Sequence, residues 1–177
     1  MLQYKIITDV TTEPVTAAEA RVHLRVLDTA DDTYITSLIA SARSYAESAH
    51  ACAYADKTIE AVTDTLGNID LPIKTLKTLT SVVLTDSDGV EHNITADFIA
   101  DYYSSRLIYT GSTNAYKLYK VNPIKVTYVA TGTPDKTTRQ AILLLVGHWY
   151  ENRGDESNAD IPEAAKRLLG LSFNGAN

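Results

Sequence analysis

The residues best suited to chemistry in this 177-residue sequence are four histidines, one cysteine and two pairs of adjacent carboxylates. The histidines are His23, His50, His92 and His148. No two of them have the i, i+4 spacing of a helical zinc site, so the sequence predicts no metal centre from histidine. Cys52 is the only cysteine, which excludes an intramolecular disulfide and a cysteine-based zinc site.

Each of these groups has a structural interpretation. His148 lies beside Trp149 in an apolar segment, where a hydrogen-bonded structural histidine is the expected state. His92 follows a turn signal, and we expect it to be solvated. Cys52 ends an alanine-rich segment and is expected to be a buried, inert thiol.

The acidic pairs also lack a catalytic pattern. Asp31-Asp32 fits the start of a helix, where carboxylates interact favourably with the helix dipole, and Asp155-Glu156 fits a solvated loop. Asp86, Asp88 and Gly89 loosely resemble a calcium loop, but the required glutamate and the other ligand positions are missing.

The sequence therefore predicts a protein that is not an enzyme, with no catalytic residue, metal or cofactor. Its glycines are scattered singly, so no phosphate-binding loop is present, and no serine has a nucleophile-elbow context. The net charge of −6 argues against general affinity for nucleic acid. The longest apolar run, Ala141 to Val146, is too short to cross a bilayer, and the opening residues do not resemble a signal peptide, so we expect a soluble intracellular chain.

A helical hairpin is predicted over residues 16–52. Thr16 and Glu19 have the spacing of a capping box at the start of a helix that continues to Leu27. A second helix is predicted from a continuous apolar stripe, with Arg43 and Glu47 mostly outside it. The stripe consists of Ile35, Leu38, Ile39, Ala42, Tyr45, Ala46 and Ala49.

A β-rich insertion is predicted over about residues 57–130. Strands are expected at residues 58–66, 79–85, 90–95, 97–103, 106–109 and 124–130. The Asp88-Gly89 turn should make the second and third of them antiparallel. Residues 110–122 have loop composition with interleaved tyrosine and lysine, which is typical of functional or mobile loops.

Two C-terminal helices are predicted at residues 137–153 and 162–170. Thr137 or Thr138 is expected to cap the first, whose central turns are apolar on nearly all sides and must be covered by its own domain or by neighbouring subunits. Gly154 and the run after it should end that helix, and Pro162 begins the second. The tail from Asn174 is expected to be disordered in isolation. The predicted fold class is α+β, mainly α: a helical hairpin and C-terminal helices packed with a small antiparallel sheet, in a single domain over residues 1–177.

Several well-separated segments, taken together, resemble the gp6-like head–tail connector (adaptor, or head completion) family of tailed siphophages. The most specific is the run from Arg139 to Arg153, and the run from Val15 to Val26 is similar to the family's opening helix. The residues around Asp31-Asp32 and Ile35, the central residues 71–89 and the closing segment from Pro162 also match in the family's order. The resemblance covers roughly residues 15–170.

The resemblance implies a structural virion protein. It implies an adaptor ring of about twelve copies beneath the portal in the head–tail neck, which meets a stopper or tail-completion protein on its other side. The implied location is the host cytoplasm before assembly and the virion afterwards, with double-stranded DNA passing through the lumen without specific binding. The expected ring and portal interface consists of Arg139, Ile142, Leu145, Val146, Trp149, Tyr150, Leu168 and Leu169. The expected docking loop carries Tyr116, Lys117, Tyr119 and Lys120.

Three other functions compete with this one. A stopper or tail-completion protein of the same neck is the nearest, but such proteins are usually β-rich, whereas here two helical regions frame the sheet. A small enzyme with the tyrosine-rich loop as a lid would need a convergent set of catalytic groups, which the sequence lacks. A DNA-binding regulator would need a basic recognition helix, whereas the second predicted helix carries Asp31, Asp32 and Glu47 against Arg43 alone.

Overall fold

The computed structural model describes residues 2–8, 12–112, 116–153 and 161–173, with side chains described up to residue 170. Its helices are α1 (Ala17–Leu24), α2 (Asp32–His50), α3 (Lys136–Glu151) and α4 (Glu163–Phe173), with a short 3-10 helix at Thr95–Asp97. Its strands are β1 (Gln3–Thr8), β2 (Lys57–Thr63), β3 (Ile69–Asp70), β4 (Leu76–Thr85), β5 (Glu91–Asn93), β6 (Phe98–Asp101), β7 (Arg106–Tyr109) and β8 (Ile124–Ala130). The α+β class is confirmed, although helix, at about 35%, hardly exceeds strand, at about 30%.

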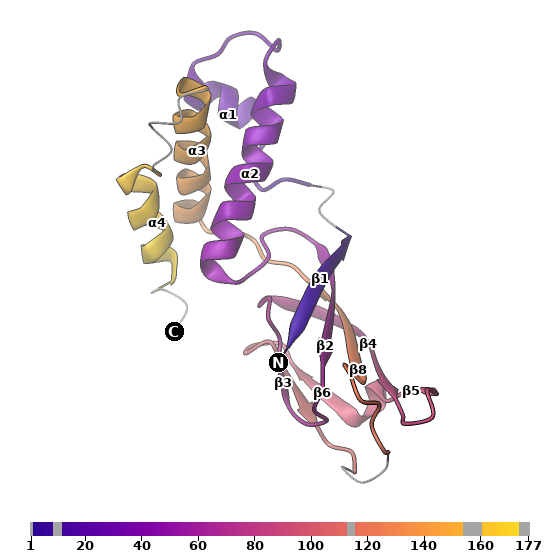
Figure 1. Ribbon diagram of the computed structural model, residues 1–177. Coiled ribbons are helices and arrows are strands. Elements are labelled where there is room, and N and C mark those ends of the chain that lie inside the picture. The colour runs from indigo at the N-terminus through magenta and orange to yellow at the C-terminus, as the bar shows by residue number, and fades with distance from the viewer. Residues whose placement is uncertain (1, 9–11, 113–115, 154–160, 174–177) are drawn as a thin grey trace. The chain divides into compact units, whose positions relative to one another are not determined.

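The chain forms two compact units. Unit 1 consists of residues Met1–Thr11 and Ala51–Gly132 and contains the strands. Unit 2 consists of Thr12–His50 and Thr133–Asn177 and contains α1 to α4 (Figure 1). The β-rich segment thus lies between α2 and α3 in the chain, with β1 added from the start of the chain. The helices pack on one another within unit 2.

Unit 1 is built from two antiparallel sheets. The larger has the strand order β1-β2-β8-β4-β5, and the smaller has the order β3-β7-β6. The predicted strands at 106–109 and 124–130 are confirmed at both ends, and the Asp88-Gly89 turn joins β4 to an antiparallel β5. Gly89 has a φ of 81°, a left-handed conformation that glycine adopts without a steric penalty. Neither β1 nor β3 was predicted.

The two sheets of unit 1 share one hydrophobic core. Alternate residues of β2 and β8 point inward, so that Ile59, Ala61, Val126 and Tyr128 are fully buried. The Tyr128 hydroxyl is satisfied inside this core, because it donates to the carbonyl of Ile73 and accepts from its N–H, both at 3.2 Å. Burial raises the pKa of Tyr128, so the phenol stays neutral and serves as a structural anchor.

In unit 2, α1 begins with the predicted capping box. The Thr16 hydroxyl accepts from the Glu19 N–H at 3.2 Å, and the Glu19 carboxylate accepts from the Thr16 N–H at 2.8 Å. The predicted extension to Leu27 is wrong. Arg25 adopts a left-handed conformation that ends the helix after Leu24, and Leu27 is 97% exposed.

The apolar stripe of α2 is confirmed from Ile35 to Ala46. The burial of three residues at its end and beside it differs from the prediction. Ala49 is exposed, whereas Arg43 and Glu47 are buried. Charged side chains favour solvent, which is why the sequence pattern places both residues outside the stripe. The fold instead buries them as an ion pair.

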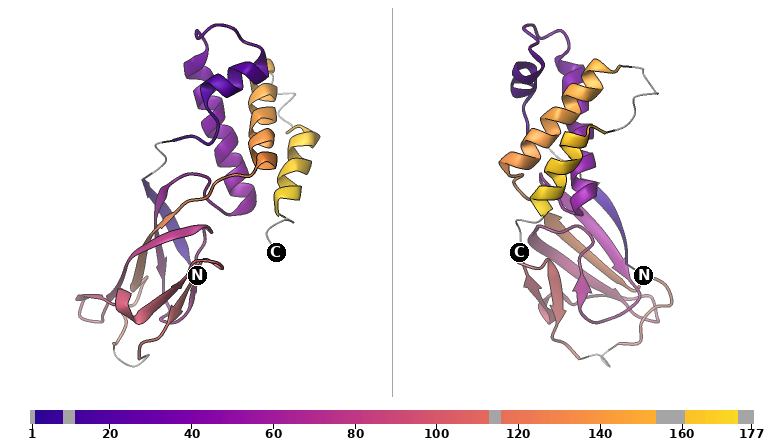
Figure 2. Two further views of the ribbon diagram at one scale, coloured as in Figure 1. Left: turned by 180° about the vertical axis from the view of Figure 1, so that it is seen from behind. Right: turned by 90° about the vertical axis from the view of Figure 1, so that its left-hand side faces the viewer.

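The long apolar helix α3 lies between α2 and α4 and also contacts α1 (Figures 1 and 2). Its own unit therefore covers several of its sides. The predicted threonine cap is wrong: Asp135 is the N-cap, and its carboxylate accepts from the Thr138 N–H at 2.7 Å. The helix ends at Glu151 with Asn152 as its cap. The run 154–158, expected to end it, and the tail from Asn174 lie outside the described residues.

Candidate assembly surfaces

The described residues show no arrangement typical of a catalytic or metal centre. Among them, no three His, Cys, Asp or Glu side chains converge as metal ligands would. Within the same ranges, no helix is both long and apolar enough to span a bilayer. The functional argument therefore concerns surfaces, and the groups that hold those surfaces in shape.

His92 and Asp86 form a structural pair in unit 1. The prediction that His92 is solvated is wrong: it is half-buried, its Nε2 lies 2.7 Å from Asp86 Oδ2, and its ring packs on Tyr116 with centroids 4.7 Å apart. Asp86 also accepts from the N–H groups of Val90 and Asp88. These bonds, that from His92 first, lower the pKa of Asp86. The carboxylate that suggested a calcium loop is thus used to close the β4–β5 turn.

The start of α3 is fixed to α1 by Arg139. Its Nη2 lies 2.6 Å from Glu19 Oε1, and its Nη1 donates to the carbonyl of Pro14. Glu19 also serves the capping box, and the hydrogen bonds from Thr16, with a smaller contribution from Arg139, lower the pKa of Glu19. One carboxylate therefore joins the cap of α1 to the first turns of α3.

The end of α3 is fixed to the start of α2 by a second polar cluster. Tyr150 donates to Asp31, and Arg153 Nη2 lies 2.8 Å from the same carboxylate oxygen. The Arg153 guanidinium also lies 4.2 Å from the ring centre of Tyr34 and 4.3 Å from that of Tyr150, within the range of cation–π contacts. We call Tyr34, Asp31, Tyr150 and Arg153 the α2–α3 clamp.

The pKa shifts of Asp31 and Tyr150 follow from the geometry of the α2–α3 clamp. The hydrogen bond from Tyr150, then that from Arg153, lowers the pKa of Asp31, because both stabilise the carboxylate. The same bond raises the pKa of Tyr150, since a phenolate beside Asp31 would be repelled. Asp31 was predicted to cap a helix; the structure gives it a tertiary role that nothing in the local sequence indicated.

A buried ion pair holds the segment before α1 against α2. Arg43 Nη1 lies 2.7 Å from Glu47 Oε2, and Arg43 Nε lies 2.8 Å from Glu13 Oε2. The Arg43 and Glu47 side chains are only 5% and 6% exposed. Sequence reasoning missed this cluster, although the i, i+4 spacing of Arg43 and Glu47 was a usable signal for the pair.

The eight residues expected to form the ring and portal interface differ in exposure. Ile142, Leu145 and Val146 are fully buried and Leu169 nearly so, all within unit 2. Arg139, Trp149, Tyr150 and Leu168 are half-buried. Only the second group has surface to offer a partner; the first can act on an interface only by holding α3 and α4 in place.

A shallow groove runs between α2 and α4. It is lined by Tyr45, Ala49, His50, Lys166, Leu169 and Gly170. His50 is buried at its base, where Nε2 lies 2.7 Å from the carbonyl oxygen of Leu169 and must donate to it. This histidine joins the end of α2 to α4, and its role is structural.

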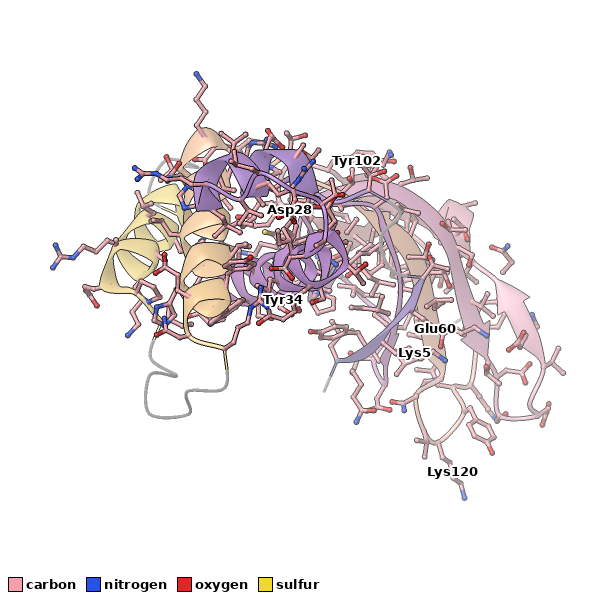
Figure 3. The ribbon with its side chains drawn as sticks, turned by 90° about the horizontal axis from the view of Figure 1, so that it is seen from above. Lys5, Asp28, Tyr34, Glu60, Tyr102 and Lys120 are labelled. Carbon is pink, nitrogen blue, oxygen red and sulfur yellow. The ribbon has the colours of Figure 1, made fainter. Side chains whose placement is uncertain are left out.

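The expected docking loop is partly built into unit 1. The backbone of residues 117–119 pairs with residues 85–87, through Ser87 N–H to the Lys117 carbonyl and Tyr119 N–H to the Thr85 carbonyl. Tyr116 packs against the core, whereas Lys117, Tyr119 and Lys120 are exposed. Lys120 extends away from the ribbon in Figure 3. Residues 113–115 of the predicted loop lie outside the described residues.

The comparison with protein families identifies the class of protein. The model of the phage gp6-like head-tail connector protein family matches residues 15–169. Since the match covers most of the chain, this protein belongs to that family, and the resemblance noted from its sequence is confirmed. Comparison with curated protein sequences gives no significant match.

Solved structures with the same fold come from gene transfer agent (GTA) particles. A chain from the neck of an empty GTA particle, computed with C6 symmetry, has a TM-score of 0.78 and 22% identity, with 96% of this chain and 94% of that chain covered. A chain from the neck of a native GTA particle, computed with C12 symmetry, has a TM-score of 0.72 and 24% identity over the same shares. A chain from the native GTA virion has a TM-score of 0.76 and 22% identity, covering 95% and 93%. At these identities the likeness establishes the fold.

Proposed function

We propose that this protein is the adaptor subunit of a tailed-phage neck. About twelve copies form a ring beneath the portal, bind the portal on one side and a stopper or tail-completion protein on the other, and let the packaged genome pass through the lumen. The chain acts by assembly and carries no catalysis of its own. It waits in the host cytoplasm and joins the virion after the head is filled.

The observation that carries this proposal is the match to the connector family over residues 15–169, combined with a fold shared along nearly the full length of neck chains. The neck structures computed with C6 and C12 symmetry support a ring. In a ring every copy meets its neighbours through two different surfaces, and closure of the rotation fixes the number of copies.

The net charge of −6 fits a protein that surrounds DNA without holding it. Proteins that bind DNA through its phosphates concentrate lysine and arginine, and each such contact slows release. A weakly repulsive lumen would instead let the genome slide during packaging and ejection. We therefore propose that the DNA contacts of this ring are transient and not specific for sequence.

In unit 2, we propose that α3 supports the ring and that α4 and the residues after it reach the portal. The half-buried residues Arg139, Trp149, Tyr150 and Leu168 are the part of the expected interface with accessible surface. The Arg139 contacts at the start of α3 and the α2–α3 clamp at its end would hold these residues in a fixed arrangement, which reduces the entropy lost on binding. The exposed Lys117, Tyr119 and Lys120 of unit 1 are proposed to dock on a neighbouring neck protein.

The proposal is tested by quantitative mass spectrometry of purified virions, with the copy number of this protein compared with that of the portal. Near-equal numbers are expected for an adaptor ring. Absence from the virion would exclude the proposal and favour a regulatory role. Preparations that lack the protein should contain filled heads and complete but separate tails, whereas incomplete tails would indicate a tail component.

A further inference from the structure

Exposed apolar side chains are concentrated in two segments of unit 1. Seven of the twelve large exposed hydrophobic residues in the described part of the chain lie either on β1 or on the β6–β7 hairpin. The seven are Tyr4, Ile6 and Ile7 on β1, and Ile99, Tyr102, Tyr103 and Ile108 on the hairpin. Isolated apolar residues are common on protein surfaces, but such clusters mark interaction sites.

Strand β1 is an open edge of the larger sheet. Among the described strands it pairs with β2 alone, and all six of its residues are exposed. Tyr4 stands opposite Ala61, and Ile6 stands opposite Ile59, both of which are fully buried. Directly opposed residues share a face of the sheet, so Tyr4 and Ile6 lie on the same face as the core residues. Unlike those residues, they are not covered by other side chains and remain exposed to solvent. Their exposed fractions are 52% and 43%.

Natural proteins protect such an edge with charged side chains, a proline, a β-bulge or a covering element. Strand β1 has one lysine, Lys5, which pairs with Glu60 at 2.7 Å and lies beside it in Figure 3, and its register with β2 shifts between Ile6 and Thr8. The unpaired backbone groups and the uncovered Tyr4 and Ile6 together fit a partner that adds to the sheet.

The β6–β7 hairpin presents a second apolar surface. Leu107 faces the core and is fully buried, whereas Ile99 and Ile108 stand opposite each other on the outer face, 59% and 39% exposed. Its turn projects Tyr102 and Tyr103 outward. The Asp101 carboxylate accepts from the Tyr103 and Ser104 N–H groups at 3.0 and 3.2 Å, so the turn is fixed before any partner binds.

The two surfaces lie at opposite margins of unit 1. In the right-hand view of Figure 2, the indigo strand β1 is at one side of this unit and the salmon β6–β7 hairpin is at the other. They differ in residue content, and both belong to one compact unit. Two unlike surfaces on opposite sides of one compact unit are what a head-to-tail contact requires, whereas one self-complementary patch would give a closed dimer.

We propose that β1 of one copy packs against the β6–β7 hairpin of the next copy, so that unit 1 contributes a second, β-mediated contact to the ring. This inference rests on the proposed function, because the occupant is a second copy of this chain in the neck. Each surface is flanked by an exposed ion pair, Lys5 with Glu60 beside β1 and Asp70 with Arg106 beside β7, and the Lys5 and Asp70 side chains are 69% and 83% exposed. Lys5 and Asp70 therefore retain surface for a contact between copies.

Cross-linking in purified virions tests the contact. In a Cys52→Ser background, Ile6→Cys and Ile99→Cys are combined in one chain, and the particles are treated with a short bismaleimide. A ladder of covalent oligomers of this protein is expected from the double variant, and none from either single variant. Ile6→Cys with Val90→Cys is the matched control, because Val90 is an exposed apolar residue outside both surfaces.

Three outcomes would overturn the proposal. The first is dimers from Ile6→Cys alone, and the second is a cross-link of either site to a different neck protein. The third is the absence of oligomers from the double variant in particles that contain as many copies of this protein as of the portal. Absence of the unmodified protein from virions would instead refute the proposed function. The two failures are therefore distinguishable.

A charge test gives an independent answer. Ile6→Glu and Ile99→Lys would each place an unpaired charge in the contact, and each should reduce incorporation into virions roughly tenfold, the effect of about 1.4 kcal/mol. The two changes together should restore part of the incorporation, because the new charges can pair. Val90→Lys should incorporate normally. Equal incorporation of all four variants would contradict the contact.

Discussion

Arg43 is the residue on which the packing of unit 2 depends most clearly. It is enclosed between Glu47 and Glu13, and with Glu47 it is almost completely removed from water. Loss of one partner from a buried pair leaves an uncompensated charge in a poorly hydrated site, which is more costly than the pair's net contribution to stability.

Arg43→Ala should therefore lower the free energy of unfolding by about 3 kcal/mol. Urea denaturation followed by circular dichroism measures the change. Lys77→Ala, which removes the exposed pair between Lys77 and Asp56, is the matched control and should cost less than about 1 kcal/mol. Similar losses for both variants would show that burial does not set the energy of the Arg43 cluster.

The α2–α3 clamp should make part of the stability of unit 2 dependent on pH. The pKa of Asp31 is lower in the folded chain than in the unfolded chain, so its contribution is fully present above the unfolded pKa of about 3.9. That contribution is lost as the pH falls through the folded pKa. Wild type should exceed Asp31→Asn in urea midpoint at pH 7, and the difference should shrink toward pH 3.

The control for this pH series is Asp28→Asn, in the same loop. Its carboxylate accepts from the Ala30 N–H at 2.9 Å, a bond that an asparagine oxygen can also accept. Asp28→Asn should therefore follow wild type across the series. A difference between wild type and Asp31→Asn that stays constant from pH 7 to pH 3 would contradict the role of the ionised carboxylate.

At the scale of elements, α1 depends on its first turn more than on its apolar face. It has eight residues, of which only Ala20 is buried. Short helices are marginal in water, so the capping box, the Arg139 contact and the Arg21–Asp32 ion pair at 3.0 Å matter more to α1 than its small buried face.

Thr16→Ala should lower the free energy of unfolding by about 1 kcal/mol, the usual effect of losing a helix cap. Thr16→Ser should retain most of that energy, because its hydroxyl can accept the same bond from Glu19. Hydrogen exchange of the α1 amides would show whether the loss is local. Unchanged exchange in the alanine variant would mean that packing, rather than the cap, holds the helix.

At the scale of the whole molecule, the two units divide the proposed task. Unit 2 carries the helices whose half-buried residues are proposed to support the ring, and unit 1 carries two uncovered β surfaces. An adaptor needs lateral contacts to close a ring and further contacts above and below it. Two units with separate surfaces provide more such contacts than a single small domain of the same length.

Trp149→Ala should abolish tail joining, because this large half-buried side chain on α3 is proposed to meet a neighbouring subunit. Electron microscopy should show filled heads separate from tails, and infectious titre should fall accordingly. Trp149→Phe should restore part of the titre, and a thermal melt of each purified variant shows whether it is folded. Normal infectious particles from a folded alanine variant would refute this assignment.

Much of the local structure followed from the sequence alone. The alternation in residues 124–130 predicted β8, the Thr16 and Glu19 spacing predicted the start of α1, and Asp88-Gly89 predicted the β4–β5 turn. These signals act over a few residues, so neighbouring side chains and backbone geometry suffice to specify them. The family was also apparent from the sequence, because its most specific segment, Arg139 to Arg153, is continuous.

Tertiary structure alone decided which side chains are covered. Leu27 fits an apolar stripe but points into solvent, whereas the charged Arg43 is buried. The residues of β1 pair with residues at least fifty positions later in β2, and Asp31 meets Tyr150 and Arg153 from the other end of the chain. Burial and pairing depend on contacts between distant segments, which no local pattern encodes. The proposed assembly surfaces are what those contacts leave uncovered.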